Sequence, residues 1–160
     1  MNADDWANFF VAQVGASAAL LGLLFVGLSL NLDKILSIGS LPDRAAIGMG
    51  LLFTILFMGS LMLVPGQSQR LLGAEVLVVG LVLLLCGGRL ELRGLRTGSH
   101  RALFMGNAMM FVIAALPYVV GGAFLFIGNS VGFYMIAAAV LLSLMKAVLD
   151  AWVLLVEINR

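Results

Sequence analysis

The sequence has little charge, one histidine and one cysteine. Charged residues make up only 11% of the 160 positions. The single cysteine, Cys86, lies in an apolar run, so it excludes an internal disulfide or cysteine-based metal site and is expected to be inert. No metal-ligand spacing, phosphate-binding loop or nucleophile elbow is present. The sequence therefore predicts no metal, no cofactor and no enzymatic activity, and a net charge of +1 gives no reason to expect nucleic acid as a partner.

Apolar residues are abundant instead. They make up 62% of the chain, and the mean hydropathy is +1.14. Ordinary soluble domains are about 45–50% apolar and about 25% charged. A soluble fold of this size has no room to bury so much apolar surface. Lipid removes that requirement and favours helices, which satisfy their backbone hydrogen bonds internally. The sequence predicts an all-α transmembrane protein.

Five stretches are long enough to cross a bilayer core about 30 Å thick, which needs about 20 apolar residues. Pro65-Gly66 and Gly128-Asn129-Ser130 mark tight turns between them. Because the connections are short, sequential helices should be antiparallel neighbours in a five-helix bundle forming one transmembrane domain over 1–160. The predicted spans are 9–32, 45–64, 71–88, 104–127 and 131–156.

The basic residues predict an orientation, because cytoplasmic loops of membrane proteins carry an excess of lysine and arginine. With five spans, only Arg70 of the nine basic residues falls on the side of the N-terminus. The other eight fall on or nearest the opposite side. We therefore expect the N-terminus outside and the C-terminus in the cytoplasm.

The first span carries a stripe that is polar at both ends and apolar in its middle. Gln13, Ser17, Leu24 and Asn31 lie on this stripe. Such a profile suits a pore-lining helix with a hydrophobic constriction. The alternative is that these polar groups hydrogen-bond across helix contacts.

Acidic residues near the outer side are candidates for attracting cations. Asp4 and Asp5 would lie at the outer mouth of a pore and concentrate cations there. Glu75, in the outer half of the third span, either binds a cation or pairs with Arg70 or interfacial water. A separate face of the first span carries small residues, from Gly15 to Gly22, that permit close helix approach.

The fifth span contains two ionisable residues, Lys146 and Asp150, at i, i+4 spacing. They share a helix face and are expected to form an intramembrane ion pair. Ionisable residues inside a membrane are costly and are candidates for function. The alternative is a structural pair, with Lys146 extending to the cytoplasmic interface.

Pro117 lies in the middle of the fourth span and is a candidate hinge. Proline removes a backbone hydrogen bond and kinks a helix, and Gly121-Gly122, one turn later, is expected to loosen it further. Proline is also ordinary in membrane helices, so a purely structural role stays open.

The loop between the third and fourth spans is basic and next to the membrane. We expect it to contact anionic lipid headgroups on the cytoplasmic side, each basic residue contributing about 1 kcal/mol. A docking site for a cytoplasmic protein is the alternative. The residues concerned are Arg89, Arg93, Arg96 and Arg101.

Three blocks of the first half resemble a family of small, largely uncharacterised bacterial polytopic membrane proteins. The blocks read GASAALLGLLFVGLSLNL, SLPDRAA and LVPGQSQRLLGAE, and they occur in the same order in that family. The resemblance implies a multi-pass protein of the bacterial cytoplasmic (inner) membrane. It implies no activity, ligand or catalytic residue.

Together these patterns favour a small homo-oligomeric channel-like or transport protein for small inorganic ions, with the first helix lining the path. Symmetry would place such a path at the oligomer axis. The alternative is a non-transporting protein that binds and modulates another membrane complex.

Overall fold

The computed structural model describes residues 6–39, 41–97 and 101–158, and every regular element in these ranges is a helix. Five long helices and one short one follow each other along the chain. Their bounds are α1 Ala7–Leu30, α2 Leu32–Ser37, α3 Leu41–Met62, α4 Gln69–Thr97, α5 Arg101–Phe126 and α6 Val131–Ile158. The predicted all-α class is confirmed for the described part of the chain.

The five long helices are apolar enough, and long enough, to cross a membrane. They overlap the five predicted spans, so the chain has the character of a multi-pass membrane protein. Two details differ from the prediction. The segment after the first span contains the short helix α2, and α4 continues to Thr97 although its span was expected to end near Gly88.

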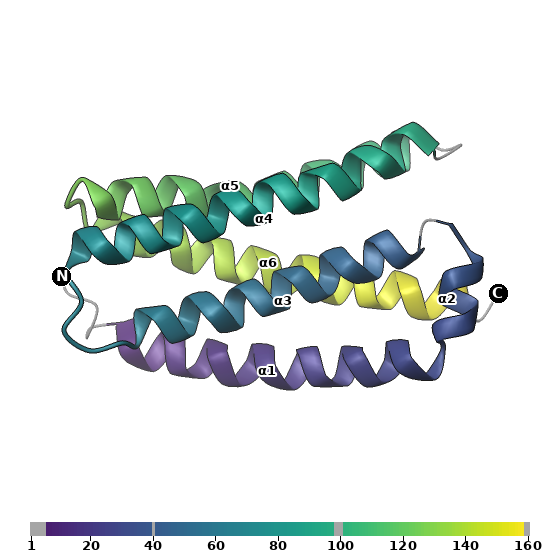
Figure 1. The fold of residues 1–160 in the computed structure, drawn as a ribbon, viewed down its shortest axis with the longest axis horizontal. Helices are drawn as coiled ribbons and strands as arrows, with labels where there is room; N and C mark the ends of the chain where they lie inside the picture. Colours follow the sequence, from purple (N-terminus) through teal and green to yellow (C-terminus); the bar gives the residue numbers. More distant parts are fainter. Residues whose placement is uncertain (1–5, 40, 98–100, 159–160) are drawn as a thin grey trace.

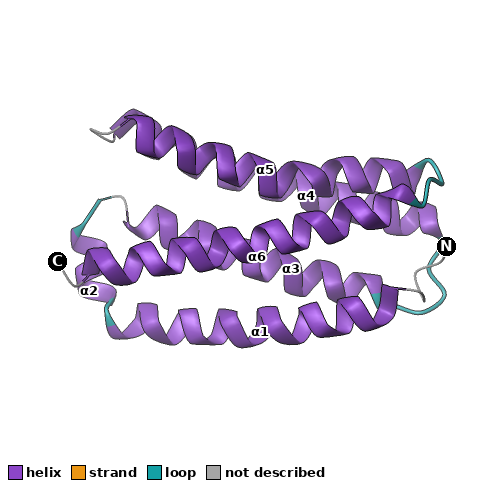
Figure 2. Ribbon diagram, turned by 180° about the vertical axis from the view of Figure 1, so that it is seen from behind, coloured by secondary structure: helices purple, strands orange, loops and turns teal. Residues whose placement is uncertain are grey.

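The helices form an elongated bundle with α3 and α6 at its centre. Figure 1 and the reverse view in Figure 2 show α4 and α5 side by side along one edge, α1 along the other, and α3 and α6 between them. Helix α1 begins at one end of the bundle and α6 ends at the opposite end, beside α2. This arrangement fits an odd number of crossings.

Glycines bring the backbones of α4, α5 and α6 into direct contact. A Cβ added at Gly73 of α4 would lie 2.3 Å from the Phe126 nitrogen of α5, and one at Gly122 of α5 would lie 2.6 Å from the Leu77 nitrogen of α4. A Cβ added at Gly121 would lie 2.9 Å from the Ile136 side chain of α6. Gly121 and Gly122, which the sequence suggests as loosening residues, thus pack closely on the two neighbouring helices.

Helix α1 is attached less extensively than the other helices. Only Phe10, Ser17 and Leu28 of its 24 residues are buried, whereas eleven residues of the 22-residue α3 are. Its main close approach is at Gly59 of α3, where an added Cβ would lie 2.6 Å from Val14. The opposite face of α1 is exposed along its length, so in a membrane it meets lipid or another protein.

Candidate functional site

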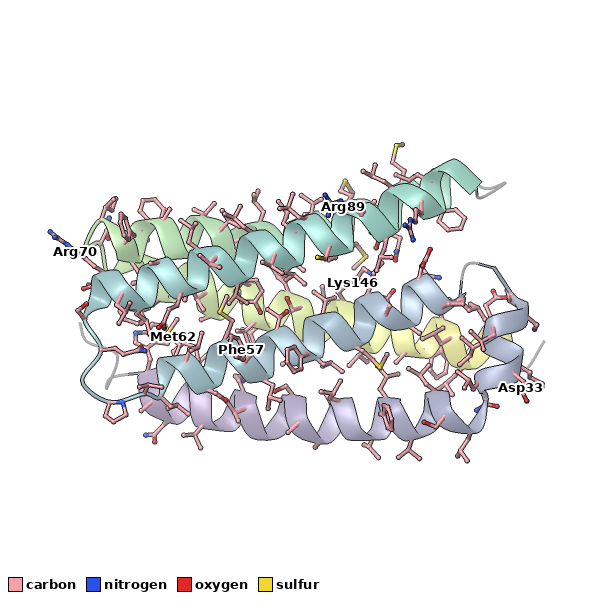
Figure 3. The ribbon with its side chains drawn as sticks, viewed as in Figure 1. Asp33, Phe57, Met62, Arg70, Arg89 and Lys146 are labelled. Carbon is pink, nitrogen blue, oxygen red and sulfur yellow. The ribbon has the colours of Figure 1, made fainter. Side chains whose placement is uncertain are left out.

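Four helices bring five polar side chains together in the half of the bundle nearer α2. We call them the charge cluster: Arg44 from α3, Glu91 from α4, Asn107 from α5, and Lys146 and Asp150 from α6. Figure 3 shows Lys146 in the interior, well away from Arg70 and Asp33 at the two ends of the bundle. The cluster lies within the apolar helices, where ionisable groups are costly.

The contacts of the charge cluster close into a ring. Arg44 Nε lies 3.2 Å from Asp150 Oδ1, and Arg44 Nη2 donates to Asn107 Oδ1 at 2.9 Å. Asn107 Nδ2 donates to both carboxylate oxygens of Glu91, at 2.8 and 2.9 Å. Lys146 Nζ lies 3.9 Å from Glu91 Oε1 and also pairs with Asp150, which completes the ring. Asn107 thus joins a cation to an anion through its two amide ends.

The positive and negative charges of this ring balance, which lowers the free-energy cost of burying them. Two cationic and two anionic groups face each other, and Glu91, Lys146 and Asp150 are 5%, 1% and 2% exposed. Removing two ions from water costs several kcal/mol each unless their partners and hydrogen bonds compensate. Here each buried ion has an opposite charge within 4 Å. Losing any one of them upsets this balance, and losing Lys146 leaves Glu91 without a cation within 4 Å.

A small polar cavity of about 50 Å³ adjoins the charge cluster, and Gly39, which lies between α2 and α3, is also in its wall. Arg44, Glu91 and Asn107 line its inner side. Asp43 of α3 and Gly94 of α4 are also in its wall. A space of this size holds a few water molecules, since one water needs about 10–15 Å³ measured in this way. Water can therefore lie beside Glu91.

On the other side of the charge cluster, two hydroxyl groups extend the polar interior toward the middle of the bundle. Ser143 precedes Lys146 by three residues, so the two share a face of α6. Ser143 and Tyr118 are both fully buried, and the Tyr118 hydroxyl interacts with Ser143. Neither hydroxyl has a hydrogen bond of regular geometry within the described residues. Farther along α6 the buried residues are apolar, such as Ile136 and Phe133.

The expected Lys146–Asp150 ion pair is present, but its setting differs from the expectation. Lys146 does not extend to the interface; it points into the bundle and is 1% exposed, because Glu91 and Asp150 both lie within its reach. Arg44, Glu91 and Asn107 had not been identified as site residues. Arg44 and Glu91 fall just outside the predicted spans, and only the leucines that surround Glu91 in RLELRGL signalled that α4 continues.

The α1 stripe faces the rest of the same chain and not outward. Ser17 is fully buried and donates to the Val14 carbonyl at 3.1 Å, while Leu24 packs on the core. Gln13 is half-buried, and Asn31 donates to the Gly27 carbonyl at the end of the helix. A path at an oligomer axis lined by these side chains would require a different rotation of α1.

The remaining candidates are scattered over the bundle. Glu75 accepts hydrogen bonds from the Gln67 amide, a partner that the sequence did not indicate. Arg89 and Arg93 are exposed, as lipid-contacting residues should be. Helix α5 continues through Pro117 without a break.

Several predicted residues have no described side chain. Asp4 and Asp5 lie outside the described residues, and for Arg96 and Arg101 only the helical backbone is described. No group of three histidine, cysteine or acidic side chains that could hold a metal ion occurs within residues 6–39, 41–97 and 101–158.

These features define a multi-pass helical membrane protein with a buried ring of charges. A comparison with models of known protein families finds no match, and neither do comparisons with curated proteins and with solved structures.

Proposed function

We propose that this chain is a small ion-transport protein whose ion-handling site is the charge cluster. The observation that carries the proposal is a ring of four ionisable side chains from α3, α4 and α6, three of them buried, inside an apolar bundle. Ionisable residues in membrane helices are rare and mark ion and proton pathways in many membrane proteins, and a buried ion pair adds little stability by itself. Transport was also the function favoured by the sequence, with the path on α1; the burial of Ser17 moves the proposed path to the charge cluster.

The contacts of Lys146 suggest how an ion is exchanged. Its ammonium group is a built-in cation between the carboxylates of Glu91 and Asp150, and the contact to Glu91 is the longer one, at 3.9 Å. A proton or small cation that arrives through the polar cavity competes with Lys146 for Glu91. Once Glu91 is neutralised, Lys146 retains Asp150 alone. The hydroxyls of Ser143 and Tyr118 are then the next polar groups toward the middle of the bundle.

Orientation and location form part of the same proposal. Eight of nine basic residues were assigned to one side of the membrane, and that side corresponds to the end of the bundle with α2. The charge cluster would then open to the cytoplasm of a bacterium, through the cytoplasmic membrane that the sequence blocks imply. Exposed Arg89 and Arg93 lie toward the same end and suit contact with anionic lipids.

Flux through reconstituted protein tests the proposed function. We expect proteoliposomes to show protein-dependent movement of H⁺, Na⁺ or K⁺, measured with entrapped dyes under an imposed gradient. Glu91→Gln keeps the shape and one acceptor oxygen but removes the charge, and should lower the flux at least about tenfold, a change of about 1.4 kcal/mol in the barrier. Asp33→Asn, which removes an exposed carboxylate on α2, is the matched control and should have no effect. Absence of flux for all three ions would contradict the proposal.

We further propose that the protein is a homo-oligomer in which the outer face of α1 contacts a second copy. Gly15 and Gly22 lie on this exposed face, and an added Cβ at either position meets nothing within 4 Å in the single chain. Small residues allow membrane helices to approach closely, and α1 uses few of its residues within the chain.

Cysteine cross-linking in membranes tests this interface. In a Cys86→Ser background, Gly22→Cys should form disulfide-linked dimers on oxidation, because symmetry brings equivalent positions together. Leu24→Cys, which faces the core of the same chain, is the matched control and should stay monomeric. Equal cross-linking at both positions, or none at Gly22→Cys, would contradict the interface.

The exposed α1 face also supports a second candidate function, because it can form an interface with another protein. In that case the chain modulates a different membrane complex, and Gly22→Cys should cross-link to one stoichiometric partner of another mass. Arg93→Gln should then alter the activity of that partner, while reconstituted protein alone conducts no ion.

A further inference from the structure

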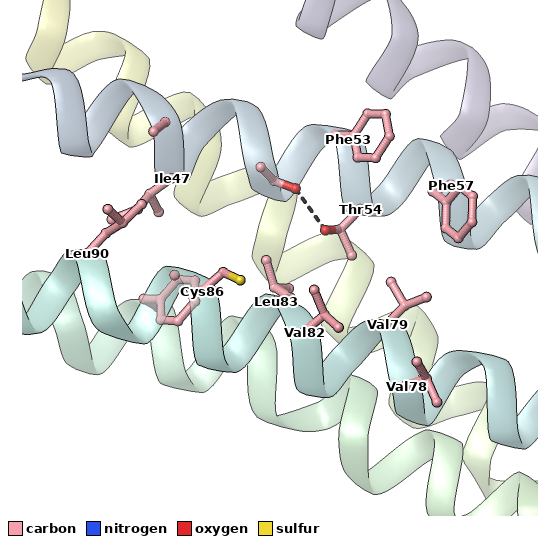
Figure 4. Close-up of a pocket in the computed structure, with 14 residues that line it drawn as sticks. Ile47, Phe53, Thr54, Phe57, Val78, Val79, Val82, Leu83, Cys86 and Leu90 are labelled. Atoms are coloured by element: carbon pink, nitrogen blue, oxygen red, sulfur yellow. Dashed lines mark hydrogen bonds between the residues drawn. The ribbon is translucent and has the colours of Figure 1, made fainter.

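An apolar groove runs between α3 and α4 and opens on the side of the bundle (Figure 4). We call it the α3–α4 groove. Its volume is about 370 Å³. Helix α3 lines it with Gly50, Phe53 and Phe57, and α4 lines it with Val82 and Cys86. Phe111 of α5 forms its floor.

The groove is an unfilled seam between helices that are otherwise closely packed. Where glycines of α4 and α5 touch the neighbouring backbone, an added Cβ would collide, yet at Gly50 it would meet nothing within 4 Å. The one hydroxyl in the wall, Thr54, already donates to the Gly50 carbonyl at 2.8 Å. The groove therefore offers contact area and no free hydrogen-bonding group, which suits a hydrocarbon chain.

At the end nearer α2, the α3–α4 groove passes into the polar cavity beside the charge cluster. Ile47 and Leu90 line both spaces, so they are adjacent along the same seam. Asp43 lies on the groove face of α3, seven residues before Gly50, and lines the polar cavity. Arg93 lies on the groove face of α4, seven residues after Cys86, and is exposed.

The two walls thus end in opposite charges. An anionic group above the groove would be attracted to Arg93 on the α4 side, and a cationic group to Asp43 on the α3 side. The cavity wall also contains Arg44, but its guanidinium group is already bonded to Asp150 and Asn107. A purely anionic headgroup would therefore be repelled by the Asp43 carboxylate in that wall, which disfavours it. A zwitterionic headgroup satisfies both walls.

We propose that the α3–α4 groove binds a membrane phospholipid with a primary-ammonium headgroup, of the phosphatidylethanolamine type. One acyl chain lies in the groove, the phosphate faces Arg93, and the ammonium group faces Asp43. The proposal is independent of ion transport, because it rests on the groove and its two end charges.

Lipid retention, measured by native mass spectrometry, tests the site. The full-length protein is incubated with equimolar phosphatidylethanolamine and phosphatidylglycerol in detergent, and the lipid still bound is identified. We expect the wild type to retain phosphatidylethanolamine about tenfold over phosphatidylglycerol, the discrimination of one charge-assisted hydrogen bond. Gly50→Leu should reduce retention of both lipids to background, because its side chain fills the groove. The matched control Gly106→Leu, on an exposed face of α5 with open space around it, should behave as wild type.

Charge variants separate the headgroup contacts. Asp43→Asn should abolish the preference for phosphatidylethanolamine, and Arg93→Gln should weaken retention of both lipids. Equal retention by wild type and Gly50→Leu, a preference for phosphatidylglycerol, or an unchanged ratio in Asp43→Asn would overturn the proposal.

The single cysteine supplies a second readout on the unaltered chain. Cys86 is exposed and lies in the groove wall. Added phosphatidylethanolamine should slow alkylation of Cys86 by a small maleimide in detergent, by about the same tenfold factor relative to phosphatidylglycerol. Identical alkylation rates with both lipids would overturn the proposal even if Gly50→Leu fails to fold.

Discussion

Replacing Lys146 with methionine should be among the most destabilising single substitutions in this protein, at about 3–5 kcal/mol. Methionine fills a similar volume, so the cost is electrostatic. The Lys146 ammonium group is the shared partner of Glu91 and Asp150, and both carboxylates are at least 95% buried. Without it, two buried carboxylates face only Arg44 and the Asn107 amide. The free energy of unfolding in mixed micelles, titrated with sodium dodecyl sulfate, measures this loss.

A paired substitution separates charge balance from packing. Lys146→Met combined with Glu91→Gln removes one charge of each sign and leaves the Arg44–Asp150 pair intact. We expect the double variant to recover most of the lost free energy of unfolding, because no uncompensated charge remains. The double variant could instead lose as much free energy of unfolding as the two single variants together. That result would mean that the ring is not a coupled electrostatic unit.

Adding one methyl group at Gly122 should destabilise the bundle by about 1–3 kcal/mol. In Gly122→Ala the new Cβ would lie 2.6 Å from the Leu77 nitrogen and 3.0 Å from the Gly73 oxygen. Both contacts are backbone atoms of α4, which have no rotamer change available to relieve the overlap. The helices must separate along their whole interface.

Gly106→Ala is the matched control on the same helix. Position 106 has open space around it, so the added methyl group meets no neighbour and only reduces the flexibility of the unfolded chain. The same chemical change should therefore stabilise the protein by about 0.4–1 kcal/mol. Equal effects at the two positions in a thermal unfolding assay would contradict the close approach of α4 and α5.

Composition and run length predicted the helical class and the five long helices, because both follow from the need to keep apolar side chains in lipid. The i, i+4 spacing likewise predicted that Lys146 and Asp150 pair. These are local properties of the chain. Each could be derived from a window of fewer than about 30 residues, the length of one span.

The partners of this pair were not predictable in the same way. Arg44 and Asn107 are separated by 63 residues, and their meeting depends on how α3 and α5 pack around α6. Glu91 lies three residues beyond the predicted end of the third span, whereas α4 continues to Thr97 and the Glu91 carboxylate contacts Asn107 of α5 and Lys146 of α6. The inward rotation of the α1 stripe is equally a tertiary property, since a helix with apolar residues on all faces does not show which face is buried.

The central claim is that function resides in the charge cluster and not on α1. The most direct test is to measure the flux of the transported ion into proteoliposomes. Glu91→Gln and Ser17→Ala are each checked for folding and compared with wild type. The account predicts that Glu91→Gln loses at least about tenfold in flux, while Ser17→Ala, whose hydroxyl bonds only to its own helix, retains the wild-type rate. Loss of flux in Ser17→Ala with wild-type flux in Glu91→Gln would contradict the account and return the path to α1.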